Sequence, residues 1–296
     1  MSLEVIATVA AWRRRFEPIW RSGRTIGLVP TMGALHAGHG ALIDAARAQT
    51  DLVAATIFVN PMQFNQRQDF EKYPRPFEED AAFCEARGVD FLFAPSNEEM
   101  YPAGHRSFVE VEGLAEHLCG RSRPGHFRGV ATVVLKLLSV TRPDRAYFGE
   151  KDFQQLALIR RMVRDFNIPV EVTGVATVRE NDGVALSSRN RRLTAEQRLA
   201  APALYRALLA AQACVAAGER DPAVVRREAS KLIEECPGVK LDYFDLVDCE
   251  TTQPVARIEG PVQAAGAIWI GDVRLIDNMP IPSCALKAGI VKSNKG

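Results

Sequence analysis

The chain contains few of the residues that build disulfide frameworks or zinc sites. Its six cysteines are scattered through 296 residues without a Cys-x-x-Cys pair, and it has only five histidines. Cysteines at this spacing predict free thiols in a reducing compartment, and they argue against a disulfide-stapled or zinc-binding protein. We therefore expect a cytoplasmic location.

The chain also lacks a long apolar run and an excess of charge of either sign. No apolar run approaches the roughly 20 residues that span a bilayer, and the first residues do not have the basic start, apolar core and cleavage site of a secretory signal. The formal net charge is only +1, so we expect no membrane and no nucleic-acid partner. Apolar residues at 47% and charged residues at 25% indicate a globular protein of one large or two ordinary domains.

The most informative stretch is PTMGALHAGHGAL, residues 30–42. The apolar run before it, residues 25–29, predicts a buried strand of a parallel sheet. Helical spacing of the apolar residues after it predicts a helix that begins near His39. A glycine-containing turn that leads into a helix presents free N–H groups and the positive end of the helix dipole. The stretch therefore predicts a phosphate site.

Two histidines in this turn, His36 and His39, sharpen the prediction. Histidines three residues apart share one helical face, so both rings can reach the same group of oxygens. Gly38 leaves room for the close approach of a phosphate. A cationic or hydrogen-bond-donating imidazole pair would stabilise the charge that grows as the bond between two phosphates breaks. A metal site and a plain surface location are the alternatives, and the metal is disfavoured because no cysteine pair lies at ligand spacing.

Polar residues also follow the next predicted strand, residues 52–59. Pro61 ends this strand, and Asn60 and Gln63 emerge at its carboxyl end. Ligands of open α/β sheets bind outside the carboxyl ends of the strands. Asn60 and Gln63 are therefore candidate substrate contacts, with plain turn residues as the alternative.

Cations gather in three further segments. Residues 121–129, RSRPGHFRG, predict an anion-binding loop, with a solvated basic loop as the alternative. The same order of strand, glycine and helix start occurs again at residues 145–153. Lys151 in this segment suits phosphate, and Asp152 suits a helix cap or a ribose or metal contact. Gln155 lies one helical turn beyond Lys151 and would face the same cavity. Residues 187–189, Ser-Ser-Arg, would bind triphosphate oxygens or cap the next element.

The remaining periodicity predicts the other elements. Helices are expected over residues 3–22, 77–87, 130–140, 153–166, 195–217 and 222–235, and strands over residues 89–93, 107–111, 145–148, 170–178, 241–247, 263–270 and 273–277. Residues 66–76, with two prolines, are expected to form a loop.

This order of elements predicts an α/β protein. A Rossmann-like parallel sheet flanked by helices, residues 1–185, would form the catalytic domain. A smaller α+β domain, residues 186–283, would follow and act as a lid, with the hinge at residues 178–190. Residues 284–296 are expected to be a mobile tail.

Six stretches together resemble the motifs of one family. PTMGALHAGHGAL, FVNPMQF, SRPGHF, FGEKDFQQ, LSSRNRRL and GDVRLIDN are similar to those of the pantothenate synthetase (pantoate–β-alanine ligase) family. They run from residue 30 to residue 278, whereas His-x-Gly-His alone would indicate only the broader nucleotidylyltransferase superfamily. The resemblance implies a homodimeric ligase that uses ATP and Mg²⁺ to join pantoate to β-alanine through a pantoyl adenylate, on the pathway to coenzyme A.

The resemblance also implies roles for individual residues. The catalytic groups would be His39, as general acid, with His36, Lys151 and Arg189. The ATP site would comprise Met32, Gly33, Ala34, Leu35, His36, Ala37, Gly38, His39, Gly149, Glu150, Lys151, Asp152, Val178, Leu186, Ser187, Ser188 and Arg189. Pantoate and β-alanine would be bound by Gln63, Gln155 and Arg123, together with Asn60 at the strand end. Asp80 would lie near the Mg²⁺.

One departure from the family pattern lies in the first motif. Gly40 stands where relatives usually carry a bulky apolar residue, and it would weaken the helix start by about 1 kcal/mol. Two other functions fit parts of the pattern. One is a nucleotidylyltransferase that acts on a phosphate, such as phosphopantetheine adenylyltransferase, and the other is a catalytically silent nucleotide-binding relative.

Overall fold

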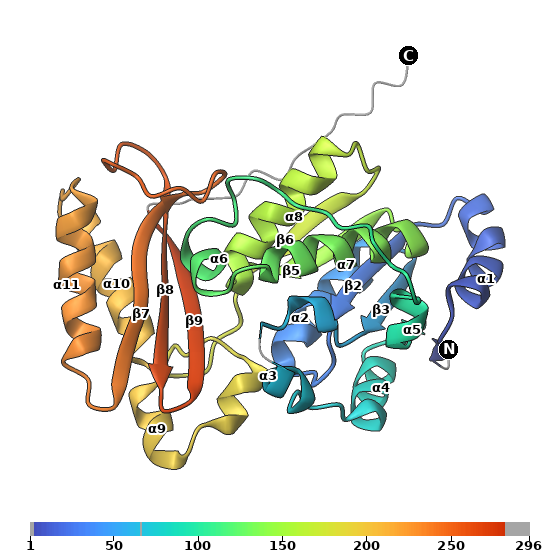
Figure 1. The fold of residues 1–296 in the computed structure, drawn as a ribbon, viewed down its shortest axis with the longest axis horizontal. Helices are drawn as coiled ribbons and strands as arrows, with labels where there is room; N and C mark the ends of the chain where they lie inside the picture. Colours follow the sequence, from blue (N-terminus) through green and yellow to red (C-terminus); the bar gives the residue numbers. More distant parts are fainter. Residues whose placement is uncertain (1–2, 66, 282–296) are drawn as a thin grey trace.

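The computed structural model describes residues 3–65 and 67–281, which build two separate sheets (Figure 1). In chain order the elements are β1 (Glu4–Ile6), α1 (Val9–Arg21), β2 (Ile26–Thr31), α2 (Ala37–Gln49), β3 (Leu52–Ile57), η1 (Pro61–Gln63), α3 (Arg67–Glu71), α4 (Phe77–Ala86), β4 (Phe91–Phe93), α5 (Asn97–Met100), α6 (Leu118–Ser122), α7 (His126–Thr141), β5 (Arg145–Gly149), η2 (Glu150–Asp152), α8 (Phe153–Asp165), β6 (Glu171–Val175), η3 (Ser188–Arg192), α9 (Ala195–Ala200), α10 (Ala203–Ala216), α11 (Pro222–Glu234), β7 (Val239–Asp248), β8 (Val262–Ile270) and β9 (Val273–Ile281), where η denotes a 3-10 helix. The predicted tail, residues 284–296, lies outside the described residues.

The larger sheet has six parallel strands in the order β1-β4-β3-β2-β5-β6. Its central strands β2 and β3 are apolar almost throughout, because both of their faces are buried. β2 lies between β3, which follows it through α2, and β5, which comes much later in the chain. The parallel, helix-flanked architecture expected from the sequence is confirmed.

Helices cover both faces of this sheet, and successive side chains along a strand point to opposite faces. Leu28 packs in a core with residues of α1, α7 and α8, while the next residue, Val29, packs in a core with residues of α2 and α4. In the first core, Trp12 stacks on Phe16 with ring centroids 4.1 Å apart, and both side chains are fully buried. The two layers hold the strands rigidly, so their carboxyl ends form a fixed edge.

The smaller sheet is antiparallel, with the order β7-β8-β9. In Figure 1 it stands beside the six-stranded sheet, with α10 and α11 on its outer side. Alanine and leucine side chains of α10 pack with apolar residues of all three strands. This separate apolar cluster of the smaller sheet is called the second core below. The boundary predicted at residue 185 falls in the connection between β6 and η3, next to Val184, which packs in this second core.

The first predicted helix, residues 3–22, is wrong at its start. Residues Glu4–Ile6 form β1, which pairs in parallel with β4 at the edge of the large sheet. The helix begins only after Thr8, whose side-chain hydroxyl accepts a hydrogen bond from the backbone N–H of Ala11 at 3.2 Å. A strand of three residues is too short to show period-two alternation, so its pairing with β4 decides it.

Three other local predictions need correction. Residues Arg67–Glu71 of the predicted loop form the short helix α3. Residues 107–111 form no strand, because the backbone N–H of Val109 donates to the hydroxyl of Thr132 on α7 instead of to a neighbouring strand. The predicted loop at residues 121–129 is mostly helical, since α6 ends within it and α7 begins at His126.

Gly40, the departure from the family pattern, lies where a side chain from another element needs room. A Cβ atom at this position would lie 2.5 Å from the guanidinium carbon of Arg87, whose Nη1 donates to both carboxylate oxygens of Asp44 at 2.9 and 2.7 Å. The glycine therefore lets the guanidinium of Arg87 lie against the first turn of α2.

The cysteines largely match the expectation of free thiols. Cys84, Cys119, Cys214 and Cys236 are free. Cys249, just after the end of β7, is disulfide-bonded, so the expectation is wrong at that position.

Residues 195–216 reach the length and mean hydropathy of a membrane-spanning helix, although the sequence analysis expected no such segment. The chain there forms two helices, α9 and α10, with Pro202 between them. The buried residues of α10 pack against the antiparallel sheet in the second core. This packing accounts for the apolar composition of the segment.

The boundary between β1 and α1 makes a prediction about Thr8. At the N-cap of a helix, Thr8→Ala should lower the free energy of unfolding by about 1 kcal/mol, because the N–H of Ala11 loses its partner. Urea unfolding measures this, with the exposed Arg14→Ala on α1 as the control. A Thr8→Ala protein at least as stable as the parent would instead support a helix that continues through Thr8, because alanine is the better helix former.

Candidate active site

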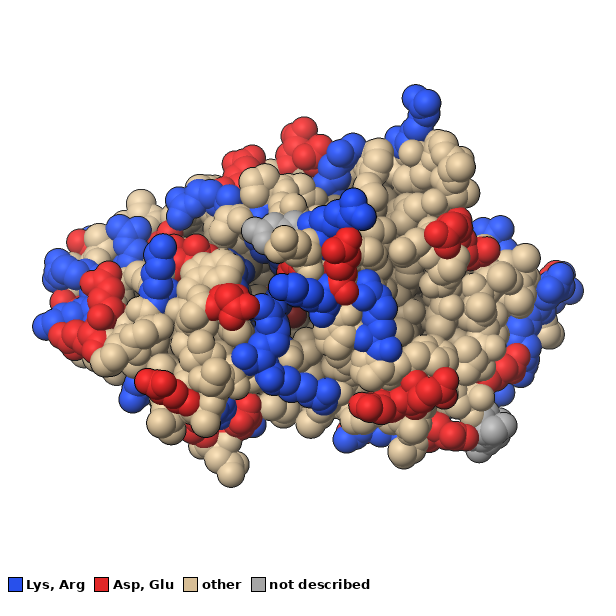
Figure 2. Space-filling model, turned by 60° about the horizontal axis from the view of Figure 1, so that its bottom comes forward, with Lys and Arg blue, Asp and Glu red and all other residues tan. Residues whose placement is uncertain are grey.

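The carboxyl ends of β2, β3 and β5 open into one cavity of about 240 Å³. β2 lies between β3 and β5, so the cavity sits where the order of the strands reverses, the usual ligand position in open α/β sheets. Residues around the start of η3 line its other side. Figure 2 shows Lys and Arg side chains gathered around a hollow near the centre of this face.

Most of the predicted site residues meet in this cavity. It is lined by Met32, His36, Gly38, His39, Asn60, Gln63, Arg123, Gly149, Lys151, Asp152, Gln155, Val178, Leu186, Ser187, Ser188 and Arg189. Six predicted residues do not line it: Gly33, Ala34, Leu35, Ala37, Asp80 and Glu150. Gly33, Ala34 and Leu35 lie in the turn before α2, and Ala37 is the first residue of α2. Their backbone positions the two histidines.

The two histidines form a hydrogen-bonded cap at the N-terminus of α2. The Nδ1 atom of His36 accepts from the backbone N–H of Gly38 at 3.1 Å, and the Nδ1 atom of His39 accepts from the backbone N–H of His36 at 3.3 Å. His36 therefore precedes the helix, which corrects the prediction that both residues lie on a helical face. The rings are still neighbours, with centroids 4.1 Å apart. Because each Nδ1 is an acceptor, each neutral ring carries its proton on Nε2.

Both imidazoles are neutral at pH 7. Burial lowers the pKa of His36 to about 4, helped by the positive charges of Lys151 and Arg191. Burial also lowers the pKa of His39 to about 3, and a charge on His36 would lower it further. Of the two forms considered from the sequence, the structure supports the donating pair: each ring presents an Nε2–H group and no net charge.

Asp80 holds the turn that precedes the histidines. Its two carboxylate oxygens accept the backbone N–H groups of Ala34 and Leu35, each at 2.7 Å, and the side chain is only 3% exposed. Ala34 has a left-handed backbone, with φ at 51°, so the turn needs this support. Asp80 thus holds the turn and does not line the cavity, and its expected position near a Mg²⁺ ion stays a prediction. Among the described residues, no group of three His, Cys, Asp or Glu side chains could hold a metal.

The Gln63 side chain is held in the cavity by η1 and its neighbours. Its Oε1 atom accepts from the Nδ2 atom of Asn60 at 3.0 Å, and its Nε2 atom lies 2.8 Å from the sulfur of Met32. Asn60 is itself buried and also receives the hydroxyl of Tyr101 at 2.8 Å. Asn60 therefore orients Gln63 and caps η1, which supports the turn-residue alternative, while substrate contact by Asn60 stays a prediction.

His126 is a buried residue of the site that the sequence analysis did not single out. Its Nδ1–H donates to the backbone carbonyl of Gln63 at 2.8 Å, and its Nε2 atom lies 3.1 Å from Nη1 of Arg123, which must be the donor. Burial, with the charge of Arg123, lowers the pKa of His126 to about 3. His126 is therefore a neutral bridge that ties α7 to η1. Its place in the SRPGHF motif was the available signal.

The lining of the cavity combines charged and apolar side chains. On η2 and just after the start of η3 lie the cations Lys151 and Arg189, together with the carboxylate of Asp152. Desolvation opposes ionisation of Asp152, but Lys151 and Arg189 outweigh it and lower the pKa of this carboxyl. Apolar side chains that the sequence did not single out also line the cavity, namely Phe58, Phe64, Val130, Val133, Val134, Leu137 and Phe148. The cavity thus suits a ligand that carries both anionic and apolar groups.

The comparison with known families agrees with this geometry. The sequence profile of the Pantoate-beta-alanine ligase family matches residues 4–280. The chain belongs to the pantoate–β-alanine ligase family. It is 53% identical to the pantothenate synthetase of Moorella thermoacetica, over 94% of this chain and 98% of that protein, and 48% identical to that of Thermotoga petrophila, over 93% and 99%.

Solved structures of the pantoate–β-alanine ligase family share the fold. Pantothenate synthetase from Thermus thermophilus superposes with a TM-score of 0.86 at 45% identity, covering 93% of this chain and 98% of that one. The Francisella tularensis ligase, solved in complex with "Beta-gamma ATP and Beta-alanine", superposes with a TM-score of 0.77 at 35% identity, over 94% and 97%. The family resemblance drawn from the six motifs is confirmed.

The neutral state of His126 makes a prediction about acid stability. In the unfolded chain this histidine binds a proton near pH 6.5, but the folded protein resists protonation until about pH 3. The contribution of His126 to the free energy of unfolding is therefore fully present above pH 6.5. It is lost as the pH falls toward 3, by up to about 1.4 kcal/mol per pH unit. His36 and His39 act in the same direction.

His126→Gln removes one of these groups. Urea unfolding between pH 6.5 and 4.5 should then show a shallower decline of the free energy of unfolding than in the parent, even though the variant is less stable at pH 7. Parallel pH profiles for the two proteins would contradict the neutral, bridging state of His126.

Proposed function

We propose that this protein condenses pantoate with β-alanine at the expense of ATP, and releases pantothenate, AMP and pyrophosphate. Membership of the pantoate–β-alanine ligase family carries the proposal. The cavity supports it, because a pair of imidazole donors faces a lysine and an arginine at the mouth of a helix. The relative from Francisella tularensis, solved in complex with "Beta-gamma ATP and Beta-alanine", supports ATP and β-alanine as two of the ligands.

In the first step the carboxylate of pantoate attacks the α-phosphorus of ATP. A bond forms between the carboxylate oxygen and phosphorus, and the α–β bridge bond breaks to release pyrophosphate. Negative charge then gathers on the bridge oxygen and on pyrophosphate. The Nε2–H groups of His36 and His39 and the cations Lys151 and Arg189 would stabilise it. With a single proton on Nε2, each neutral ring would first act as a hydrogen-bond donor. For His39 to act as the general acid, the negative charge of the incoming phosphates would have to raise its pKa until Nδ1 takes up a second proton in place of the hydrogen bond from His36.

The amide side chains would hold pantoate beside the phosphate. Gln63 and Gln155 line the cavity and are uncharged, so they would hydrogen-bond the hydroxyl groups of pantoate without trapping its carboxylate. The apolar wall around Phe58 and Val134 would receive the two methyl groups of pantoate. Arg123, anchored to His126 and to the carbonyl of Gln63, would form part of the same wall.

In the second step the amine of β-alanine attacks the acyl carbon of the adenylate. A C–N bond forms, the acyl–phosphate bond breaks, and AMP leaves with the electron pair. The adenylate would hydrolyse if water entered, so the cavity mouth must close. We propose that α3 and η3 take part in this closure, since a carboxylate oxygen of Asp69 on α3 lies 3.7 Å from Nη1 of Arg192 on η3.

A Mg²⁺ ion fits the site as part of a nucleotide complex. Magnesium is usually held by one or two carboxylates together with phosphate oxygens and water. Asp152 is the carboxylate among the described cavity residues and would serve as that ligand. The ion would neutralise charge on the departing pyrophosphate.

We also propose, from the family resemblance, a homodimer in the cytoplasm. The free thiols of Cys84, Cys119, Cys214 and Cys236 support a reducing compartment, while the disulfide at Cys249 counts against it. Gel filtration with light scattering tests the oligomeric state.

One assay separates the possible reactions. The protein is incubated with ATP, Mg²⁺ and pantoate, with and without β-alanine, and pyrophosphate, AMP and amide are measured. Stoichiometric amide and AMP support the ligase. A dinucleotide formed with phosphopantetheine would indicate a nucleotidylyltransferase, and ATP binding without turnover would indicate a silent relative.

The donor role of His39 makes a kinetic prediction. His39→Ala should slow adenylate formation by at least about 10²-fold, because proton donation and charge stabilisation are both lost. Single-turnover release of pyrophosphate measures this step, and circular dichroism checks the fold. His117→Ala, a histidine outside the cavity, is the control. A His39→Ala rate close to that of the parent would remove His39 from the chemistry.

The position of Gln63 makes a prediction about binding. Gln63→Ala should weaken pantoate binding by about tenfold, the loss expected for one or two hydrogen bonds, while ATP binding stays nearly unchanged. Isothermal titration with each ligand measures both constants. Equal weakening of the two ligands would show that Gln63 supports the cavity as a whole instead of contacting pantoate.

A further inference from the structure

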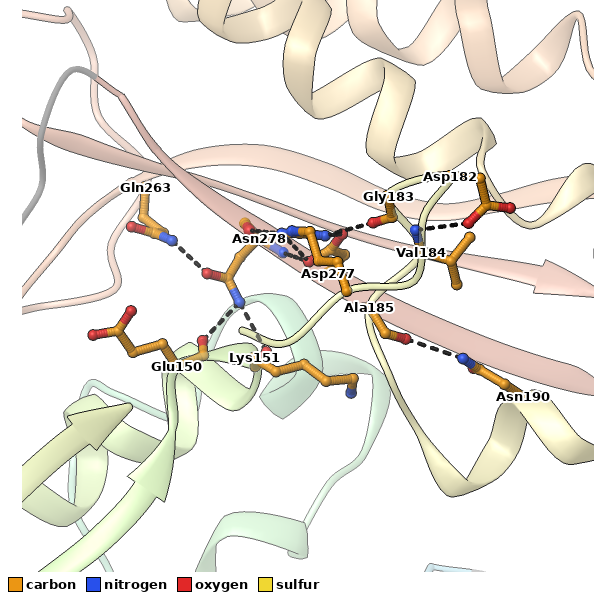
Figure 3. Close-up of polar contacts among 11 residues, drawn as sticks. Glu150, Lys151, Asp182, Gly183, Val184, Ala185, Asn190, Gln263, Asp277 and Asn278 are labelled. Atoms are coloured by element: carbon orange, nitrogen blue, oxygen red, sulfur yellow. Dashed lines mark hydrogen bonds and ion pairs between the residues drawn. The ribbon is translucent and has the colours of Figure 1, made fainter. Parts of the chain in front are cut away.

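Two adjacent residues of β9, Asp277 and Asn278, contact both segments that carry cations to the cavity (Figure 3). One segment is η2, which bears Lys151. The other is the hairpin formed by residues 178–186, which leads directly to Arg189. β9 belongs to the antiparallel sheet, so these contacts tie the smaller sheet to the active site.

The side-chain amide of Asn278 holds η2 by its backbone. Its Nδ2 atom donates to the carbonyls of Glu150 and Lys151 at 3.0 and 2.8 Å, so both of its hydrogens are used. The Nε2 atom of Gln263, on β8, donates to the Oδ1 atom of Asn278 at 2.5 Å and fixes which way the amide points. Asn278 is 7% exposed and Gln263 is 4% exposed, so water cannot take the place of these partners.

Asp277 holds the hairpin in the same way. Its carboxylate accepts two hydrogen bonds from Arg179, at 2.5 and 3.0 Å, and a third from the backbone N–H of Asn278 at 2.8 Å. Arg179 also donates to the carbonyl of Gly183 at 2.9 Å, on the opposite arm of the hairpin. The N–H of Leu186 closes the hairpin by donating to the carbonyl of Val178 at 2.9 Å. The start of the Ser187–Arg189 segment is thus set by Asp277.

We propose that Asp277 and Asn278 are positioning residues for the reaction: they hold the backbones of Lys151 and of the Ser187–Arg189 segment so that their cations meet on the phosphates of ATP. The inference rests on the proposed function. An apolar pair would join the two sheets without ordering any backbone. Asn278 instead donates directly to two main-chain carbonyls of η2, and Asp277 orients Arg179, which donates to the main-chain carbonyl of Gly183. With the backbone of η2 held at two successive carbonyls, only the side chain of Lys151 is left free to move.

Asn278→Ala tests the tie to η2. Titration calorimetry with α,β-methylene-ATP, which needs no turnover, should show at least tenfold weaker binding, because binding would then have to order η2 and place Lys151. The kcat/KM for ATP and the single-turnover rate of pyrophosphate release should fall at least as much. The KM values for pantoate and β-alanine should stay within about twofold of the parent, because the side-chain hydrogen bonds of Asn278 go to Gln263, Glu150 and Lys151 and not to Gln63, Gln155 or Arg123.

Gln253→Ala is the matched control. Gln253 also reaches from the second half of the chain to the first, where its Nε2 atom donates to the carbonyl of Gly113 at 2.7 Å, away from the cavity. It should lose stability without any change in the constants for ATP. If Asn278→Ala does not fold, Gln263→Met replaces it: this variant keeps Asn278 but frees its amide to turn, and a smaller loss confined to ATP is expected.

The outcomes separate the two proposals. Weaker analogue binding in the Asn278 or Gln263 variant, absent from Gln253→Ala, supports the positioning role. Unchanged ATP constants, or equal losses for all three substrates, overturn it while an active parent leaves the proposed function standing. A parent that forms no AMP from the three substrates counts against the proposed function itself, and the analogue titration still decides the role of Asn278 in nucleotide binding.

Discussion

The site depends on two hydrogen bonds from the backbone to imidazole rings at the start of α2. They occupy the Nδ1 atoms of His36 and His39, so the only protons on the neutral ring nitrogens are those on Nε2. Burial keeps both rings neutral, since a charge here would lie in a poorly solvated place beside Lys151. A neutral N–H group can donate a hydrogen bond to a phosphate oxygen, and no bound counterion has to leave it first. Two Nε2–H donors at the positive end of a helix dipole suit an anionic ligand.

The same principle recurs in and beside the cavity, where three side chains have their orientation set by a further partner. Asn60 orients Gln63, and Arg123 fixes the tautomer of His126. Gln263 orients Asn278. Such partners matter because an amide or imidazole can turn over and exchange donor for acceptor at little steric cost. A cavity that must place several donors on one triphosphate needs each of them held in one orientation before the ligand arrives.

The two sheets contribute to the site in different ways. The parallel sheet provides the cavity, since its strand ends converge where the order reverses. The antiparallel sheet lines little of the cavity itself, yet its last strand contacts η2 and the hairpin at residues 178–186. The last strand of the antiparallel sheet therefore links the two separate backbone segments that carry Lys151 and Arg189.

The sequence by itself determined the features that arise within a few residues of chain. The turn and helix start at residues 30–42 and the placing of Gln155 one turn beyond Lys151 follow from local periodicity and turn chemistry, so they could be predicted. Other features were decided only by tertiary structure, because they join residues far apart in the chain. β1 exists through its pairing with β4, Asp80 holds a turn 45 and 46 residues away, and Asn278 holds a carbonyl 127 residues away. The pKa of a buried histidine belongs to this second group, since desolvation comes from packing and not from neighbours in sequence.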